Sequence, residues 1–261
     1  MDLGMKGKTA LVLCAGGGLG RAISVAMARE GVVVALADID EGMLTASVAE
    51  IKAAGVRAVS GVVDLNNTAA LKSFVTRVSQ ELGGIDILVN ISGGPPPSKA
   101  ENVSPEQWSK QFQAMVVSMI HVTDIVLPGM RAKKWGRIIT STSSGVLAPI
   151  PNLGISNTLR SALVGWSKTL ASEVADDGIT VNIVIPGRIA TGRIRQLDEV
   201  RAAREDKTIE EIVRLSTASI PMRRYGKPEE YANVVVFLAS DKASYITGTM
   251  IRVDGGMIQT V

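Results

Sequence analysis

The sequence is poor in the residues from which several kinds of site are built. Among its 261 residues there is one cysteine, Cys14, and one histidine, His121. A single cysteine excludes an internal disulfide framework and fits a reducing compartment, so we expect a cytoplasmic protein. One imidazole, with no cluster of cysteines and histidines around it, excludes the usual zinc sites, and we expect no bound metal.

Aromatic residues make up only 3% of the chain, and the formal net charge is a small +3. The basic residues are scattered and are not interleaved with aromatics, so binding to nucleic acid is not expected. No apolar run approaches the roughly 18 to 20 residues that cross a bilayer, and residues 1–10 lack the apolar segment of a secretory signal. We therefore expect a globular protein with no part in a membrane.

Short apolar runs alternate with helix-like segments along the whole chain. Residues 32–37 are continuously apolar, which is typical of a parallel strand covered on both faces. Seven strands are predicted, at residues 8–14, 32–37, 56–63, 85–90, 136–142, 179–187 and 249–255. The helices between them predict an α/β fold of the Rossmann type, a doubly wound, seven-stranded parallel sheet with helices on both faces. No linker interrupts the alternation, so we expect a single domain over residues 1–261.

Residues 188–225 stand apart because they are charged and rich in arginine. We predict a helix near 196–217 and a lobe that covers the substrate over the carboxyl ends of the strands, where such sheets bind ligands. Two capping boxes mark helix starts, at Ser104 and at Thr208.

A glycine-rich run from Gly16 to Gly20 lies between the first strand and the first helix. Such a run is weak evidence alone, but an acid, Asp38, ends the next strand twenty residues beyond Gly18. Glycines let a pyrophosphate approach the backbone, and the helix N-terminus supplies N–H donors. Asp38 would bind ribose hydroxyls and repel a 2′-phosphate, so a dinucleotide is predicted, with NAD favoured over NADP. The alternative is a structural turn beside a solvated aspartate.

The chain resembles the short-chain dehydrogenase/reductase family over essentially its whole length. The matching residues are Gly18-Leu19-Gly20, Asp38, Asp64-Leu65, Leu88-Val89-Asn90 with Gly93, Gly136-Arg137-Ile138-Ile139, Ser143, Val181-Asn182, Pro186-Gly187 with Thr191, Ala243-Ser244-Tyr245-Ile246-Thr247-Gly248 and Val253-Asp254-Gly255-Gly256. The resemblance implies a homotetramer, or a homodimer, that binds a nicotinamide dinucleotide.

The resemblance also assigns the cofactor contacts. Asp64 and Leu65 would flank the adenine, Asn90 would lie by the adenine-side ribose, and residues 186–191 would line the nicotinamide and its carboxamide. The full set of implied cofactor-binding residues is Gly16, Gly18, Leu19, Gly20, Asp38, Asp64, Leu65, Asn90, Gly93, Pro186, Gly187, Ile189 and Thr191.

Three of the four catalytic residues of the family are replaced in this chain. Members relay a proton through Asn, Ser, Tyr and Lys, the last two spaced as Tyr-x-x-x-Lys. Ser143 matches the serine, whereas Ser156 stands at the tyrosine position and Arg160 at the lysine position. Met115 takes the place of the asparagine, and Cys14 stands where the family has glycine.

These replacements change the chemistry that the site can perform. The pKa of a serine hydroxyl is several units above that of a phenol, and arginine does not give up its proton. Alcohol oxidation by this set would be slow. Carbonyl reduction is easier: Ser143 and Ser156 polarise the oxygen, Arg160 stabilises the developing negative charge, and water supplies the proton.

The chain is similar to an atypical subgroup related to β-ketoacyl carrier-protein reductases. The similarity rests on the GGPPP loop at 93–97, on residues 156–160 and on residues 186–191. The expected substrate is a small carbonyl compound or a secondary alcohol.

Three arginines, Arg188, Arg193 and Arg195, follow the strand that lines the nicotinamide. They could bind a carboxylate or phosphate of an anionic substrate, or form a solvated face of the lobe. Two other functions stay open, a non-redox lyase or dehalogenase-like enzyme on this scaffold and a dinucleotide-binding protein without catalysis. The retained Gly18 and Gly20 count against a dehalogenase.

Overall fold

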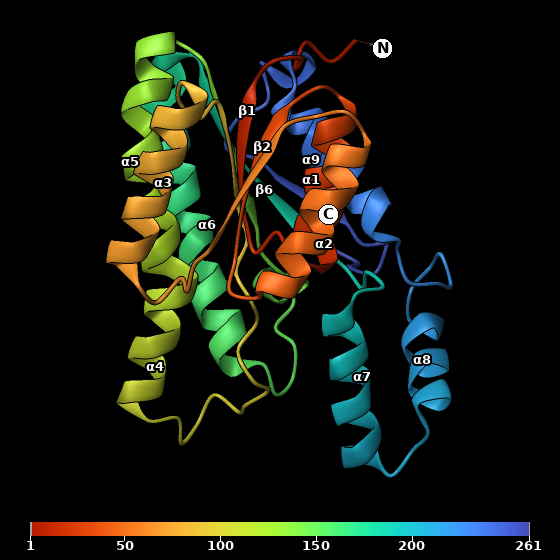
Figure 1. Cartoon of the computed structure of the whole chain (residues 1–261). Coiled ribbons are helices and arrows are strands. Elements are labelled where there is room, and N and C mark those ends of the chain that lie inside the picture. The colour runs from red at the N-terminus through yellow and green to blue at the C-terminus, as the bar shows by residue number, and fades with distance from the viewer. Residues whose placement is uncertain (1, 261) are drawn as a thin grey trace.

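Seven parallel strands form one sheet, so the carboxyl ends of all the strands lie at the same end of the sheet (Figure 1). The structure, a computed structural model, describes residues 2–260. The strand order is β3-β2-β1-β4-β5-β6-β7. The bounds are Thr9–Leu13 (β1), Val33–Asp38 (β2), Ala58–Val62 (β3), Ile87–Asn90 (β4), Gly136–Ser141 (β5), Ile179–Pro186 (β6) and Met250–Val253 (β7). The predicted seven-stranded, doubly wound sheet is confirmed.

Helices cover both faces of the sheet. One face carries α1 (Gly18–Arg29), α2 (Glu41–Ala53) and α9 (Pro228–Ala239), and the other carries α3 (Thr68–Leu82), α5 (Ser118–Lys133) and α6 (Gly154–Val174) (Figure 1). β1 shows why both layers are needed. Val12 packs into the core with α1 and α9, whereas Leu11 and Leu13 pack into the core with α3 and α5. Alternate side chains of a strand point to opposite faces, so a continuously apolar strand must be covered twice.

The helix after the fourth strand is built from three consecutive segments. It begins at α4 (Pro105–Phe112), where the Ser104 Oγ accepts a hydrogen bond from the Gln107 N–H at 3.2 Å. It continues through a π-helical turn, Gln113–Val117, into α5.

This composite helix, Pro105–Lys133, has 29 residues, and its most apolar stretch has a mean hydropathy of 1.4. By length and composition alone it could cross a membrane, although polar residues interrupt it and no uninterrupted apolar run reaches that length. In the fold 44% of that stretch is buried, and the helix packs against α3 and α6. A core helix of a globular protein passes the same test, so the finding is weak evidence for a membrane span.

The arginine-rich lobe contains two helices instead of the single helix predicted at 196–217. They are α7 (Gly192–Glu205) and α8 (Ile209–Ala218). The break lies at Asp206, which has φ 51. The predicted capping box of Thr208 is confirmed: its Oγ1 accepts from the Glu211 N–H at 3.2 Å, and the Glu211 carboxylate accepts from the Thr208 N–H at 3.1 Å. A side chain that starts a new helix satisfies the N–H groups that a continuous helix would have bonded.

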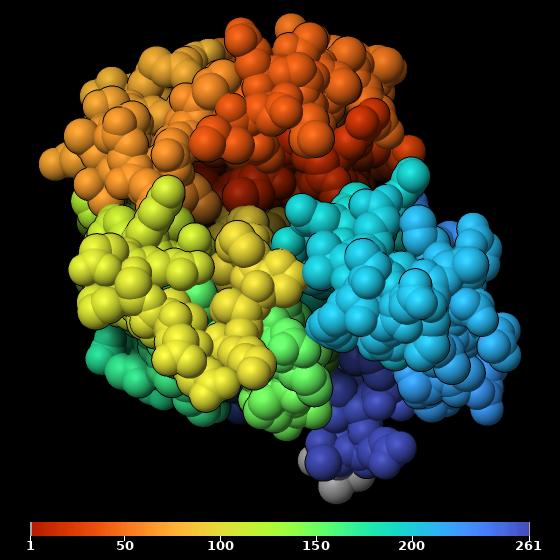
Figure 2. Space-filling model, turned by 90° about the horizontal axis from the view of Figure 1, so that it is seen from below, coloured from red at the N-terminus to blue at the C-terminus, as the bar shows by residue number. Residues whose placement is uncertain are grey.

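The winding of the sheet reverses between β1 and β4, which are neighbours in the sheet although β2 and β3 follow β1 in the chain. Such a switch point leaves a crevice at the carboxyl ends of the two strands. α4, α7 and α8 extend beyond this end of the sheet (Figure 1). Figure 2 views the molecule from that end, where the loop after β4, in yellow, lies between α4 in yellow-green and α7 in cyan.

Candidate active site

The glycine turn joins β1 to α1 and leaves the first N–H groups of the helix bare. Gly17 is the N-cap residue and provides no side-chain hydrogen bond. Gly18 has φ +52, a conformation that favours glycine. Gly20 lets the helix approach the strand, because a Cβ there would clash with the Cys14 carbonyl oxygen. The turn therefore offers unhindered backbone donors and the positive end of a helix dipole to an anion.

Asp38 ends β2 and is tied to the glycine turn. Its Oδ2 accepts a hydrogen bond from the Gly16 N–H at 2.8 Å, and its Oδ1 accepts one from the Asp40 N–H at 3.1 Å. The Ser47 hydroxyl donates to the Gly16 carbonyl at 3.0 Å and holds the turn from α2. The carboxylate predicted to bind ribose thus lies directly beside the turn predicted to bind pyrophosphate.

Cys14 adopts φ 50 at the position where the family has glycine. This left-handed conformation costs a residue with a Cβ about 1–2 kcal/mol. Burial, and then the charge of Asp38, raise the pKa of the thiol to about 12, although the Gly93 backbone and the charge of Arg160 act to lower it. The thiol is therefore protonated at neutral pH, and Cys14 is a packing residue and not a reactive one.

Four of the seven buried polar atoms that lack a hydrogen-bond partner among residues 2–260 lie where β4 and β5 end. They are Asn90 Oδ1, Ser92 Oγ, Thr140 Oγ1 and Thr142 Oγ1. The Asn90 amide nitrogen reaches only the Thr123 hydroxyl, at a long 3.4 Å. Since buried polar atoms are normally satisfied, these atoms fit a polar ligand lying across the ends of the two strands.

Asp64 and Leu65 follow β3, at the same carboxyl end of the sheet. Leu65 is buried in the core on the α3 side. Asp64 is exposed, and its Oδ1 accepts hydrogen bonds from the backbone N–H and the side-chain amide of Asn66, at 2.9 and 3.1 Å. The residues assigned to the adenosine half of the cofactor therefore follow the carboxyl ends of β1 to β4.

Ser143, Ser156 and Arg160 come from the end of β5 and the start of α6. Ser143 caps a 3-10 turn, Ser144–Val146, and its Oγ accepts a hydrogen bond from the Gly145 N–H at 3.1 Å. This turn packs against α6. Ser156 and Arg160 lie one helical turn apart on α6, and each is only 7% exposed, so both face the interior as their spacing predicts.

The Arg160 guanidinium is surrounded by carbonyl oxygens. Nη1 donates to the Ser141 carbonyl at 3.2 Å, and Nη2 donates to the Ser92 and Gly93 carbonyls at 3.3 and 3.4 Å. No carboxylate pairs with it in the described part of the chain. Burial lowers its pKa to about 10, so it is still charged at neutral pH. An unneutralised cation therefore lies where β4 and β5 end.

Met115, which is predicted to stand at the asparagine position of the family, lies in the π-helical turn. It is 1% exposed and packs with Ile155 and Leu159 in a small apolar core. Single π turns often lie at functional sites. Here the turn persists without a polar side chain, so this position cannot anchor a relay water.

Beyond β6 the chain passes over the glycine turn. Thr191 caps α7, and its Cγ2 lies 3.6 Å from where a Cβ of Gly18 would stand. Gly187 makes room for the C-terminal tail, because a Cβ there would lie 2.6 Å from the Asp254 Cα. The Ile189 side chain is buried in the core. Only the backbone of Ile189 is therefore available for the predicted contact with the cofactor.

Two of the three arginines predicted to bind a substrate anion are neutralised within the lobe. Arg188 Nη1 donates to the Asp198 Oδ1 at 2.7 Å, and the Tyr225 hydroxyl donates to the other carboxylate oxygen at 2.8 Å. Arg195 pairs with Glu199 at 3.0 Å. Sequence reasoning missed Asp198 and Tyr225, because no spacing rule joins an acid and a phenol 27 residues apart.

Arg193 is the arginine of the three without a carboxylate partner among residues 2–260. Its Nη2 donates to the Pro95 carbonyl at 2.6 Å, and its Nη1 donates to the Gln196 side-chain oxygen at 3.0 Å. It thereby links the start of α7 to the proline-rich loop after β4, the two segments that lie side by side in Figure 2.

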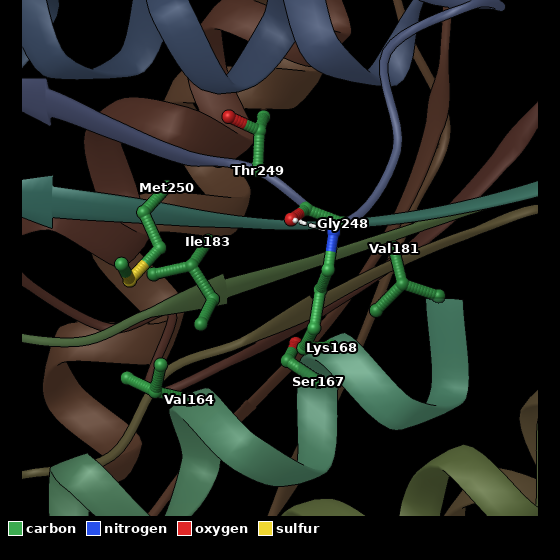
Figure 3. A pocket seen from close by; sticks show the side chains of 8 residues that line it. All are labelled: Val164, Ser167, Lys168, Val181, Ile183, Gly248, Thr249 and Met250. Atoms are coloured by element: carbon green, nitrogen blue, oxygen red, sulfur yellow. Dashed lines mark hydrogen bonds between the residues drawn. The ribbon is translucent and has the colours of Figure 1, made fainter. Parts of the chain in front are cut away.

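A cavity of about 270 Å³ lies elsewhere, between α6 and the first half of β6 at the β7 edge of the sheet (Figure 3). Its walls are mostly apolar, with Val164, Ile183 and Met250 among them. Lys168 Nζ donates across it to the Gly248 carbonyl at 3.0 Å. None of the predicted site residues line this cavity. The candidate active site is therefore identified by its polar and charged residues and not by the size of a cavity.

Comparison with known proteins supports the family that the sequence motifs predict. Residues 15–258 match the family described as enoyl-(acyl carrier protein) reductase. The 3-oxoacyl-[acyl-carrier-protein] reductase FabG of Escherichia coli (strain K12) is 35% identical over 259 residues, which cover 98% of this chain and 99% of that protein. The chain belongs to the short-chain dehydrogenase/reductase family. Nodulation protein G of Azospirillum brasilense, another similar protein, is 34% identical over 97% of this chain and 99% of its own length.

Solved structures share the fold over nearly the whole chain. L-Sorbose reductase from Gluconobacter frateurii, complexed with NADPH and L-sorbose, has a TM-score of 0.94 and 31% identity and covers 100% of both chains. An NAD+-bound xylitol dehydrogenase has a TM-score of 0.90 and 28% identity, and covers 97% of this chain and 99% of its own. This short-chain dehydrogenase/reductase is accordingly an NAD(P)-dependent oxidoreductase, and the non-redox and non-catalytic alternatives are not favoured.

Proposed function

We propose that this enzyme uses NADH to reduce a small carbonyl compound at an atypical catalytic site formed by Ser143, Ser156 and Arg160. The observation that carries the proposal is the charged Arg160 guanidinium, buried without a counter-ion where β4 and β5 end. When bound, the dinucleotide supplies the two electrons and the hydrogen that turn a carbonyl into an alcohol. The residues that would hold it are Gly16, Gly18, Leu19, Gly20, Asp38, Asp64, Leu65, Asn90, Gly93, Pro186, Gly187, Ile189 and Thr191.

The two serines would polarise the carbonyl oxygen of the substrate. Ser143 Oγ accepts a hydrogen bond from the Gly145 N–H, which leaves its own proton free for donation. Ser156, 7% exposed in the first turns of α6, would donate its own hydroxyl proton to the same oxygen. Neither hydroxyl is acidic enough to give its proton away at neutral pH. The proton that the oxygen gains therefore comes from water.

Arg160 would stabilise the negative charge that develops on the substrate oxygen. A cation in a site from which water is largely excluded acts more strongly than the same cation in water. Arginine keeps its proton where the lysine of the family can lose one, so the role of Arg160 is electrostatic. Its hydrogen bonds to Ser92 and Gly93 also fix the loop on which a substrate would lie.

The preference for NAD over NADP is supported by the surroundings of Asp38. Its carboxylate faces the glycine turn, and Asp40 follows two residues later. Arg21, a basic residue of α1, is engaged with Glu50 at 2.9 Å. A 2′-phosphate beside Asp38 would thus meet like charge with no free cation from Arg21 to offset it. The L-sorbose reductase structure contains NADPH, which favours NADP for that protein. The cofactor preference of this chain therefore has to be measured.

Three further parts of the proposal follow from the family and from the placement of the lobe. Residues 188–225 cover the substrate, because α7 starts beside the glycine turn and is linked to the loop after β4. The enzyme forms a homotetramer or a homodimer, and it is cytoplasmic.

The test of catalysis is the oxidation of NADH, followed by absorbance, across a panel of small ketones and aldehydes. Removing a donor to a developing oxyanion lowers kcat by about 100-fold or more, so we expect losses of that order for Ser143→Ala and Ser156→Ala. Arg160→Lys retains the charge and should lose less than Arg160→Met. Ser161→Ala, on the exposed face of α6, is the matched control and should retain full activity.

A protein that binds NADH but reduces no carbonyl in the panel would contradict the catalytic proposal. Cofactor preference is measured separately by titrating NADH and NADPH against nicotinamide fluorescence. Wild type should bind NADH more tightly, and Asp38→Asn should narrow the difference. Glu41→Gln, which removes a nearby exposed charge, should leave it unchanged. Tighter binding of NADPH by wild type would overturn the role given to Asp38.

A further inference from the structure

The arginines of the lobe differ in whether their charge is balanced. Three of them are partly buried: Arg188, Arg193 and Arg201. Arg188 pairs with Asp198 at 2.7 Å, and Arg201 pairs with Glu205 at 2.8 Å. Arg193 pairs with no carboxylate among residues 2–260. Its partners are a carbonyl and an amide oxygen, both neutral.

Arg193 and Arg160 contact successive residues of one loop. Arg160 donates to the carbonyls of Ser92 and Gly93. The Arg193 guanidinium lies against Gly94, where a Cβ would stand 2.8 Å from its Nη2, and donates to the carbonyl of the next residue. The two cations therefore flank the loop at the nicotinamide end of the site, and neither has an acidic partner in the described chain.

Two uncompensated guanidinium groups make this end of the site electropositive. Burial lowers the pKa of Arg160 most, and the charge of Arg193 lowers it further, whereas Tyr231 and Cys14 act to raise it. The pyrophosphate of a dinucleotide has its own donors in the bare N-terminus of α1. The carboxylate of Asp38 lies beside the glycine turn. No negative charge of the described chain balances the two guanidinium groups at the loop end, so an anionic group of a ligand would be bound favourably there.

We infer that the carbonyl substrate carries a carboxylate and that Arg193 binds it. The substrate class is a small oxo acid, with the carbonyl at the two serines and the carboxylate on the guanidinium of Arg193. An arginine binds a carboxylate through two parallel charge-assisted hydrogen bonds. Arg193 uses two of its five N–H donors for neutral oxygens, so the other three are available to a carboxylate. This inference rests on the proposed function, because it names the substrate of the same site.

The test compares pyruvate, acetoacetate and levulinate with their methyl esters, which keep the carbonyl and remove the charge. Wild type should prefer at least one acid over its ester by about 10- to 100-fold in kcat/KM, the range expected for hydrogen bonds to a charged group. Arg193→Gln should abolish the preference through KM, and Arg193→Lys should retain part of it. Arg195→Gln, whose arginine is exposed and paired with Glu199, should behave as wild type.

The outcomes separate this inference from the proposed function. Reduction of esters as efficiently as acids would leave the proposed function intact and overturn the inference. An Arg193→Gln variant that binds NADH more weakly but keeps the preference for acids would also overturn the inference, because Arg193 would then bind the pyrophosphate of the cofactor. If wild type reduced none of the compounds, the proposed function would fail. Binding of levulinate to the NADH complex, measured by fluorescence, would then decide: binding lost in Arg193→Gln supports the inference, and no binding overturns it.

Discussion

Cys14 and Arg160 are predicted to stand where the family has glycine and lysine, and the surrounding backbone accommodates both residues. Cys14 accepts a left-handed conformation at the end of β1. Arg160 exchanges the single ammonium of lysine for a fork that reaches the carbonyls of Ser141, Ser92 and Gly93. At this scale the replacement of a residue type changes the chemistry of the site without changing the course of the chain.

The thiol of Cys14 should be inert in the folded protein. Its pKa of about 12, against 9.0 when unfolded, means that the protonated form is favoured by folding. This stabilising contribution is fully present below pH 9 and is lost as the pH rises through 12. We expect no reaction with a chromogenic disulfide at pH 8 on the timescale of minutes, and rapid reaction in denaturant. Fast labelling of the native protein would contradict the buried thiol.

Substitution of Gly20 should damage both the fold and the cofactor site. In Gly20→Ala the new Cβ would clash with the Cys14 carbonyl and lie 2.9 Å from the Ala15 Cα, so α1 must move away from β1. Overpacking of this kind costs about 1–3 kcal/mol. Denaturant unfolding should show that loss, and NADH titration should show weaker binding.

The control for this change is Gly165→Ala in the middle of α6, where a Cβ has no atom within 4 Å. It should leave NADH binding unchanged and stabilise the protein by about 0.5–1 kcal/mol, since alanine is the better helix former. Equal losses in both variants would contradict a specific role of Gly20.

The residues of the site were predictable from sequence only where a local motif names them. The glycine run and Asp38 are joined by a spacing that the chain carries, and they do lie together. The carbonyl partners of Arg160 and the link from Arg193 to Pro95 depend on backbone atoms 19 to 98 residues away. Side-chain type says nothing about such contacts, so the charge imbalance at the loop emerges only in three dimensions.

At the scale of the element, the lobe is organised around one buried acid. Asp198 on α7 is 2% exposed and binds Arg188 from the end of β6 and Tyr225 from the chain after α8. This triad joins both ends of the lobe to its first helix. Burial, the largest effect, raises the pKa of Tyr225, so the phenol is a neutral donor at physiological pH.

Asp198→Asn should loosen the lobe without unfolding the sheet. It leaves the partly buried Arg188 without its counter-charge, and breaking a buried pair by removing one partner costs up to about 3–5 kcal/mol. The arginine is 25% exposed, so we expect the lower part of that range. Limited proteolysis should cut residues 188–225 faster, and KM for the carbonyl should rise.

Glu199→Gln is the control, because its partner Arg195 is 79% exposed and such a pair contributes little. Its proteolysis and KM should match wild type within error. If Asp198→Asn were cut no faster than this control, the triad would not be what holds the lobe.

Element boundaries were predictable where a cap marks them and not where a helix continues by packing. Ser104 and Thr208 begin helices as their side chains require. The break before Thr208 was missed because the charged pattern of 196–217 continues across it. The helix that Ser104 begins runs on to Lys133, and no side-chain signal marks where it ends.

At the scale of the whole molecule, the alternation of strands and helices determined the fold, and the sheet ends in two edge strands, β3 and β7. β7 is the last strand in the sheet order, and Met250 on it is 41% exposed. Phe237 on the adjoining α9 is 38% exposed, and Tyr245, which precedes β7, is fully exposed. An edge strand beside apolar side chains is a surface that a second chain can cover. No sequence pattern distinguishes it from a buried strand.

The proposed oligomer should assemble through this edge. Burying Phe237 and Met250 against a second copy removes apolar surface from water, whereas a lysine at either position places a charge in the interface. We expect wild type to sediment as a dimer or tetramer and Phe237→Lys/Met250→Lys as a smaller species with an unchanged circular dichroism spectrum. Val200→Lys makes the same change at a lobe residue that is 42% exposed and should sediment as wild type. A monomeric wild type would contradict the oligomer, and an unchanged double variant would place its interface elsewhere.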